Sequence, residues 1–226
     1  MKPSLPVLLS INGGYVDAAG FLALQGLFTS HVTGNFVTLG AALVLGSSGV
    51  VAKLLALPMF CAVVFATRLL SVGLTARGRP VLRTLLLLQL LLLIVGAALA
   101  VWLGPFHNGD GWQALVTGLT LVAAMAVQNA VHRIHLGTTP PNTIMTGNTT
   151  QLMIDLADLA RRPAAAARAP IRARALRLTG SIAAFAAGCA GAALLYDHVG
   201  IWCFTVPPLV GFGMLSLREG APVAIA

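Results

Sequence analysis

Thr33-Gly34-Asn35 and Thr146-Gly147-Asn148 are two copies of one tripeptide, and the second begins 113 positions (146 minus 33) after the first in a chain of 226 residues. This spacing is half the chain length and indicates a duplicated unit. Each copy follows a long apolar segment and opens a short one, Asn35–Leu45 or Asn148–Leu159. Two further long apolar segments come next in both cases. The tripeptides therefore divide the chain into two related halves.

A shorter match supports the duplication. Val64-Phe65-Ala66 lies in the first long segment after the first tripeptide, and Ala184-Phe185-Ala186 lies at a similar place in the second half. These matches fall in the same architecture, which gives them more weight than their length alone. We expect repeat 1 at residues 1–104 and repeat 2 at residues 105–226, together forming one membrane domain.

The composition indicates a membrane protein. Of the 226 residues, 58% are hydrophobic and 9% are charged, and the mean hydropathy is +0.90. Soluble domains carry roughly 25% charged residues, and one soluble core of this size would not bury so much apolar surface. The formal charge of +8 does not indicate a nucleic-acid partner, because the basic residues stand in short runs between apolar segments.

The predicted fold is an all-α integral membrane protein with six transmembrane helices and two short re-entrant half-helices. A helix needs about 20 residues to cross the hydrocarbon core of a bilayer. The segments of that length are Pro6–Phe28, Val51–Thr75, Val81–Leu103, Trp112–His135, Arg174–Tyr196 and Val199–Leu217. The last of them contains Pro207-Pro208, so we expect it to be kinked.

The basic loops decide the expected topology, because cytoplasmic loops are enriched in Lys and Arg. If the two short segments crossed the membrane, the Arg77–Arg83 loop and the Arg161–Arg177 loop would lie on opposite faces. If both short segments are re-entrant, these loops, Lys2 and Arg218 all face the cytoplasm of a bacterial inner membrane, as do both termini. Each half then has three full spans, so the second half is inverted relative to the first.

Each tripeptide is expected at the tip of a half-helix near the midplane of the bilayer. Backbone N–H groups at a helix N-terminus lack intrahelical partners and carry a positive partial charge. We expect the threonines to cap these groups, the glycines to allow close approach, and the asparagines to offer a donor and an acceptor. Paired half-helices can build a transport site; the alternative is that the motifs only close the core. The residues concerned are Thr33, Gly34, Asn35, Thr146, Gly147 and Asn148.

Ionisable residues within spans are costly and often functional. Asp17 lies near the middle of the first predicted span, and we expect Arg68 in the second span to pair with it. Asp17 is the candidate proton-coupling group, with a buried structural ion pair as the alternative. His31, two positions before the first tripeptide, is a candidate titrating group in the pathway. Asp155, on the second half-helix, is a candidate pathway residue.

Polar residues near the end of the fourth span have weaker assignments. Gln128 and Asn129 stand close to the place that Asp17 has in the first half, and we expect them to be its neutral counterpart. His132 and His135 share one helix face but lack a third ligand, so we expect interface anchors rather than a metal site. The sequence has no catalytic or cofactor-binding motif, and we expect neither an enzyme nor a cofactor.

Small residues recur every four positions in the fifth predicted span, at Gly180, Ala184, Gly188 and Ala192. Such a stripe lets helices approach closely. It either packs the two halves together or forms the seam of a homodimer, and the sequence leaves both open.

The sequence around the motifs resembles the YoaK family of uncharacterised bacterial membrane proteins. The resemblance rests on Gly14–Phe21, Phe28 and His31–Asn35 in the first half, and on Gln128–Ala130 and Thr143–Thr150 in the second. It implies a membrane protein and brings no activity with it.

These observations together favour a small transporter or channel for a small polar or anionic solute, with its site at the paired half-helix tips. Positive helix ends from both sides would disfavour cations. The expected partners are the lipid bilayer and the solute. The alternative is a membrane scaffold or assembly factor in which the motifs serve folding alone.

Overall fold

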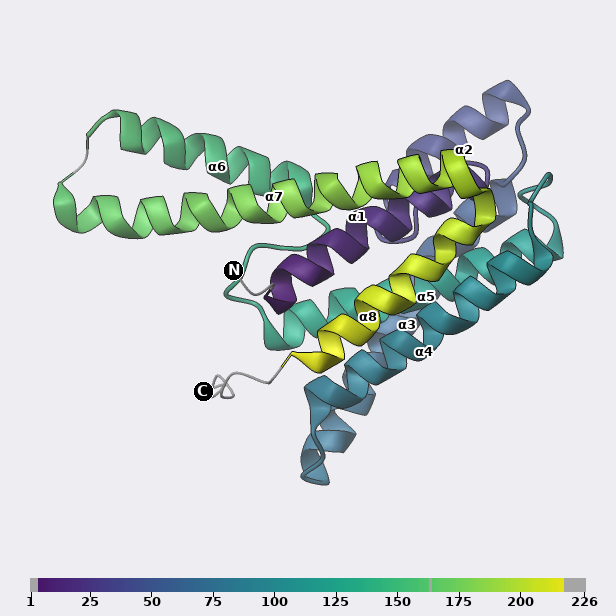
Figure 1. The fold of residues 1–226 in the computed structure, drawn as a ribbon, viewed down its shortest axis with the longest axis horizontal. Helices are drawn as coiled ribbons and strands as arrows, with labels where there is room; N and C mark the ends of the chain where they lie inside the picture. The colour runs from purple at the N-terminus through teal and green to yellow at the C-terminus, as the bar shows by residue number, and fades with distance from the viewer. Residues whose placement is uncertain (1–3, 163, 218–226) are drawn as a thin grey trace.

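The computed structural model describes residues 4–162 and 164–217, and this part of the chain consists of helices joined by loops, without strands (Figure 1). Lys2, Arg218 and the two chain ends, which enter the topology prediction, lie outside the described residues. The elements are α1 Leu5–Ala23, α2 Gly34–Leu45, α3 Val50–Ala76, α4 Val81–Leu103, α5 Trp112–His135, α6 Met145–Ala160, α7 Ala165–Val199, the 3-10 helix η1 Gly200–Thr205 and α8 Val206–Ser216.

The protein is a multi-pass membrane protein by the length and apolarity of its helices. Among the described residues, 5 helical stretches are long and apolar enough to cross a membrane, namely α1, α3, α4, α5 and the stretch Ala165–Ser216. The last contains α7, η1 and α8. The chain turns at Gly200, which has a left-handed φ of 58°, and Figure 1 shows α8 returning beside α4.

The two largest differences between the predicted and the observed helix bounds have physical reasons. The first helix ends at Ala23 rather than Phe28, because Gln25 (φ 56°) and Gly26 (φ 80°) turn the backbone to the left-handed region. The chain from residue 24 to 33 is irregular and folds back along α1. Helix α7 begins at Ala165 rather than Arg174, because the alanine-rich segment before Arg174 favours helix.

The first helix of each half packs against helices of the other half. Helix α1 packs on α7 and α8, whereas α5 packs on α3 and α4. The short helices stay within their own halves, α2 on α3 and α6 on α7. The two halves are therefore interlocked through α1 and α5.

The small-residue stripe of α7 faces α1. The sequence left open whether this stripe packs the two halves together or forms the seam of a homodimer. A Cβ at Gly188 would collide with the carbonyl oxygen of Ile11, and one at Gly14 would collide with that of Phe185. Ala184 and Ala192 are buried on the same side of α7. The stripe therefore packs the two halves together; Gly180 alone has nothing within 4 Å of its added Cβ.

The end of α1 and the loop between α2 and α3 are held side by side at one end of the molecule. Lys53 is 4% exposed, and its Nζ donates hydrogen bonds to the carbonyls of Gln25 (2.7 Å) and Ser48 (3.3 Å). The Asp110 carboxylate accepts from the backbone N–H groups of Gly49 (2.9 Å) and Val51 (2.8 Å) at the start of α3. The segment between α1 and α3 thus leaves and returns at the same place.

Candidate functional site

Asp17 anchors the irregular segment that follows α1. Its side chain lies in α1, is 3% exposed, and accepts hydrogen bonds at Oδ1 from the backbone N–H groups of Thr29 (2.8 Å) and Ser30 (2.7 Å) and from Thr29 Oγ1 (3.1 Å). At Oδ2 it accepts from Nδ1 of His31 at 2.5 Å. Irregular backbone within a membrane needs such internal partners, because lipid offers none.

The predicted pairing of Asp17 with Arg68 is wrong. Arg68 is exposed on α3, and among the described residues α1 and α3 do not pack on each other. The His31 imidazole takes the place expected for the guanidinium, because the segment after α1 folds back and brings His31 beside the carboxylate.

The Asp17–His31 pair lies at an open cavity of about 800 Å³ between α1, α2 and α7. The cavity wall is mostly apolar, with aromatic rings from Phe21, Phe28 and Phe185. The ring of Phe185 meets that of His31 edge to face, with centroids 5.5 Å apart. Thr33 and Gly34 of the first motif also line this cavity, so the first tripeptide borders the buried pair.

The two motif asparagines bind the backbone of their own segments. Asn35 pairs with both polar groups of Phe28, because its Oδ1 accepts from the Phe28 N–H (2.8 Å) and its Nδ2 donates to the Phe28 carbonyl (2.8 Å). In the second half, Asn148 Nδ2 donates to the carbonyl of Pro141 (2.7 Å). Pro141 stands 113 positions after Phe28 and has no N–H, which removes the other half of the pairing.

The predicted capping by the motif threonines is wrong. No side-chain hydrogen bond caps α2, although Thr33 is its N-cap, and Thr146 lies inside the first turn of α6, whose N-cap is Ile144. The first N–H groups of α2 are already used, because Gly34 and Asn35 donate to the carbonyls of His31 and Val32. The capping role that we expected of the threonine is filled by a backbone turn.

The two tripeptides do not form one joint site, which corrects the prediction of paired half-helix tips. Helices α2 and α6, both fully described, make no contact with each other, and Figure 1 shows them toward opposite ends of α7. Each asparagine bonds to backbone of its own half. Thr146 lines a separate open cavity of about 730 Å³ along α6, and Gly147 lies beside Ile144.

Asn129 makes in the second half a contact similar to that of Asp17 in the first. Its Oδ1 accepts a hydrogen bond from Thr143 Oγ1 at 2.8 Å, and Thr143 is the residue 113 positions after Ser30. The equivalents of Asp17 and His31 at this spacing are Ala130 and Ile144. The charged pair of the first half therefore has no equivalent at this spacing in the second.

Gln128 has a different role, at the centre of a buried amide network. Its Oε1 accepts from Asn12 Nδ2 (2.8 Å) and Gln89 Nε2 (2.8 Å), and its Nε2 donates to the Leu9 carbonyl (2.9 Å). These bonds join α1, α4 and α5. Sequence reasoning missed Asn12 and Gln89. Both are polar residues inside apolar spans, which is a signal that the sequence carries. That they face Gln128 is seen only in the fold.

Asp155 joins α6 to α7. Its buried carboxylate accepts from Arg174 Nε (2.9 Å) and Nη2 (2.6 Å), and from Gln151 Nε2 (2.8 Å). A bidentate Arg–carboxylate pair of this kind fixes the orientation of both side chains. Asp155 therefore serves the packing of this helix pair.

His132 at the end of α5 contacts the segment that leads to α6. His132 Nε2 lies 3.1 Å from Thr139 Oγ1 and 3.0 Å from the Pro140 carbonyl, so the ring holds the segment that leads to α6. Within residues 4–162 and 164–217, no group of at least 3 His, Cys, Asp or Glu side chains could hold a metal ion.

Comparison with known families gives one match. The model of a family described as Protein of unknown function (DUF1275) matches residues 5–217. This agrees with the resemblance to an uncharacterised membrane family noted in the sequence. No curated protein and no solved structure matches the chain.

Proposed function

The chain belongs to the family described as Protein of unknown function (DUF1275), and we propose that it is a small membrane transporter or channel for a small polar solute. The observation that carries the proposal is the Asp17–His31 pair, which lies in the apolar wall of a cavity of about 800 Å³. An ionisable pair at membrane depth is costly, and pairs of this kind mark solute and proton pathways.

Six spans are part of this proposal. Helix η1 rises roughly 12 Å and α8 roughly 16 Å at the usual rise per residue, and together they match a hydrocarbon core about 30 Å thick. With the turn at Gly200, α7 crosses the membrane in one direction and η1–α8 in the other. The positive-inside rule supports a cytoplasmic location for the basic loops and both chain ends, in a bacterial inner membrane.

Two inverted repeats are proposed for the same reasons. The exchange of partners, α1 with α7 and α8 and α5 with α3 and α4, is what two interlocked copies of one unit would produce. The Lys53 contacts with Gln25 and Ser48 support a re-entrant segment around α2, since its two ends meet at one face. For α6, the contact of Ser181 Oγ with the Pro141 carbonyl (3.3 Å) brings its start beside α7.

The geometry favours a neutral polar solute over the anionic one. Asp17 Oδ1 is occupied by three donors, and these stabilise the carboxylate as an anion beside the cavity. The first N–H groups of α2 donate to the preceding backbone, so they are not open to an anion. With Nδ1 of His31 bound to Asp17, the remaining ring nitrogen is the hydrogen-bonding group that meets a solute.

Solute flux tests the proposal. Proteoliposomes containing the full chain are mixed with a hyperosmotic solution of glycerol, urea or glycine. Their swelling as the solute enters is followed by light scattering. We expect swelling above that of empty liposomes for at least one probe and at least a tenfold lower rate in Asp17→Asn. Asp197→Asn, with a side chain 82% exposed at the far end of α7, is the matched control. Swelling equal to empty liposomes for every probe would count against transport.

A membrane scaffold is the second candidate, and one observation favours it. Asn35 and Asn148 are both consumed by contacts with backbone, so the motifs serve the fold directly. A scaffold predicts that the wild type and a folded Asp17→Asn protein both swell no faster than empty liposomes.

A further inference from the structure

Helix α7 is longer than a membrane span. Its 35 residues extend about 52 Å at 1.5 Å per residue, whereas the hydrocarbon core is about 30 Å thick. Its apolar part ends near Leu176, so residues 165–175 lie beyond the core. Figure 1 shows this part of α7, with α6 beside it, extending away from the other helices.

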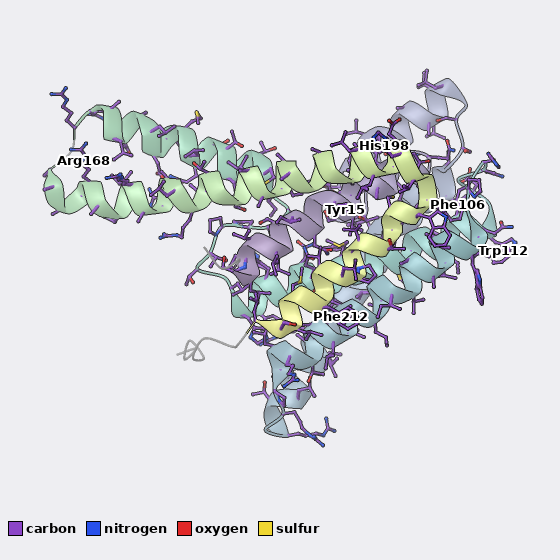
Figure 2. The ribbon with its side chains drawn as sticks, viewed as in Figure 1. Tyr15, Phe106, Trp112, Arg168, His198 and Phe212 are labelled. Carbon is purple, nitrogen blue, oxygen red and sulfur yellow. The ribbon has the colours of Figure 1, made fainter. Side chains whose placement is uncertain are left out.

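This extension is strongly basic. Between residues 155 and 177 the sequence has six arginines and two aspartates. Arg174 is used by Asp155, which holds α6 against α7. Among the described residues no acidic side chain forms an ion pair with Arg168 or Arg172, and both are exposed, with Arg168 near the tip in Figure 2.

The free arginines border a groove with an apolar floor. A shallow cavity of about 550 Å³ is lined by Arg168, Arg172 and the small side chains of Ala169 and Ala173, and it ends at Leu176. Leu176 is 65% exposed. One helix face therefore offers two cationic groups one turn apart, followed toward the membrane by apolar surface.

We propose that this face of α7 binds the headgroup of an anionic phospholipid from the adjoining leaflet. The phosphate accepts hydrogen bonds from the guanidinium groups of Arg168 and Arg172, which suit phosphate oxygens in geometry and charge. The first acyl carbons then lie along Leu176. The positive N-terminal end of α7 adds to the attraction.

A lipid is favoured over a soluble partner by position. The groove continues the part of α7 that lies in the hydrocarbon core, so a lipid in that leaflet reaches both the charged and the apolar portion without leaving the membrane. Basic residues next to a membrane surface attract anionic lipids. This proposal does not depend on the transport function.

Lipid retention provides the test. The full chain is purified with phosphatidylglycerol and phosphatidylcholine in equal amounts, and bound lipid is counted by native mass spectrometry. We expect the wild type to retain more phosphatidylglycerol than phosphatidylcholine. In Arg168→Gln/Arg172→Gln the ratio of bound phosphatidylglycerol to bound phosphatidylcholine should fall at least fivefold. Arg77→Gln/Arg79→Gln removes the same charge at the turn between α3 and α4 and should leave the preference intact. Equal retention of both lipids by the wild type, or equal loss in both double variants, would overturn the proposal.

A second measurement tests the proposal without the arginine substitutions, in case the Arg168→Gln/Arg172→Gln protein does not fold. The native cysteines are replaced, and a bimane dye is attached to Ala169→Cys in this chain. Quenching of the bimane fluorescence is measured in phosphatidylglycerol bilayers whose lipids carry a nitroxide near the headgroup. We expect strong quenching that is lost when phosphatidylcholine replaces phosphatidylglycerol. Equal quenching in the two lipids, or none in either, contradicts the proposed site.

Discussion

At the scale of single residues, Asp17 and the two motif asparagines do the same job with different chemistry. Each supplies hydrogen-bond partners to irregular backbone that lipid cannot solvate. Asp17 does this for Thr29 and Ser30, while Asn35 does it for Phe28. Removing a partner from a buried backbone group costs about 1–3 kcal/mol. The contribution of each residue to the free energy of unfolding is therefore large enough to measure.

The two asparagines should differ in their contribution to stability. Asn35→Ala leaves both the N–H and the carbonyl of Phe28 without their partner, so we expect a loss of about 2–4 kcal/mol in the free energy of unfolding. Asn148→Ala leaves one carbonyl, that of Pro141, and should cost about half as much. Denaturant unfolding in mild detergent measures both. Equal losses would mean that the missing N–H of proline does not matter.

Asp17→Asn should destabilise the protein as well as alter flux. The amide still accepts at its oxygen, but its NH₂ group cannot accept from His31 Nδ1, so we expect a loss of about 1–3 kcal/mol in the free energy of unfolding. Thermal unfolding followed by tryptophan fluorescence measures it. In the exposed control Asp197→Asn the change should stay within about 0.5 kcal/mol; a similar loss in both variants would contradict the anchoring role of Asp17.

At the scale of elements, the contact between α1 and α7 depends on the absence of two side chains. Gly188 meets the backbone of α1 and Gly14 meets that of α7, so the two helix axes approach more closely than Cβ atoms would allow. This contact ties the first half to the second. It also forms one wall of the cavity at Asp17.

Glycine-to-alanine substitutions separate this contact from ordinary helix propensity. Gly188→Ala should destabilise the protein by about 1–3 kcal/mol through overpacking. Gly180→Ala, on the same helix with nothing near its added Cβ, should stabilise it by about 0.5–1 kcal/mol. Thermal unfolding of the two variants in one detergent checks the contrast. A stabilising Gly188→Ala would show that α1 and α7 are further apart than described.

At the scale of the whole molecule, the sequence predicts the apolar helices well and their mutual contacts poorly. Runs such as Val81–Leu103 are recognised from hydropathy alone, and that helix has the predicted bounds. The end of α1 is missed because Gln25 is a non-glycine residue in a left-handed conformation, which no local pattern announces.

The candidate site shows the same limit. Asp17 and His31 are both singled out in the sequence, but their pairing depends on a segment that folds back over 14 positions. The sequence favours Arg68 as the partner of Asp17, and this prediction is wrong because α1 packs on α7 and not on α3. Such contacts depend on which helices pack together over long distances in the sequence, and hydropathy does not predict this.

The proposed topology is an inverted pair of three-span repeats with re-entrant segments at α2 and α6. Single cysteines at Ser47 and at Ala164, placed in a cysteine-free chain, test it through labelling by a membrane-impermeant maleimide in intact cells. Both positions are exposed in loops that follow the two short helices. We predict that Ser47→Cys is labelled from outside and that Ala164→Cys is labelled only after the membrane is permeabilised. Labelling of both positions from the same side would contradict the inverted repeat and the six-span topology.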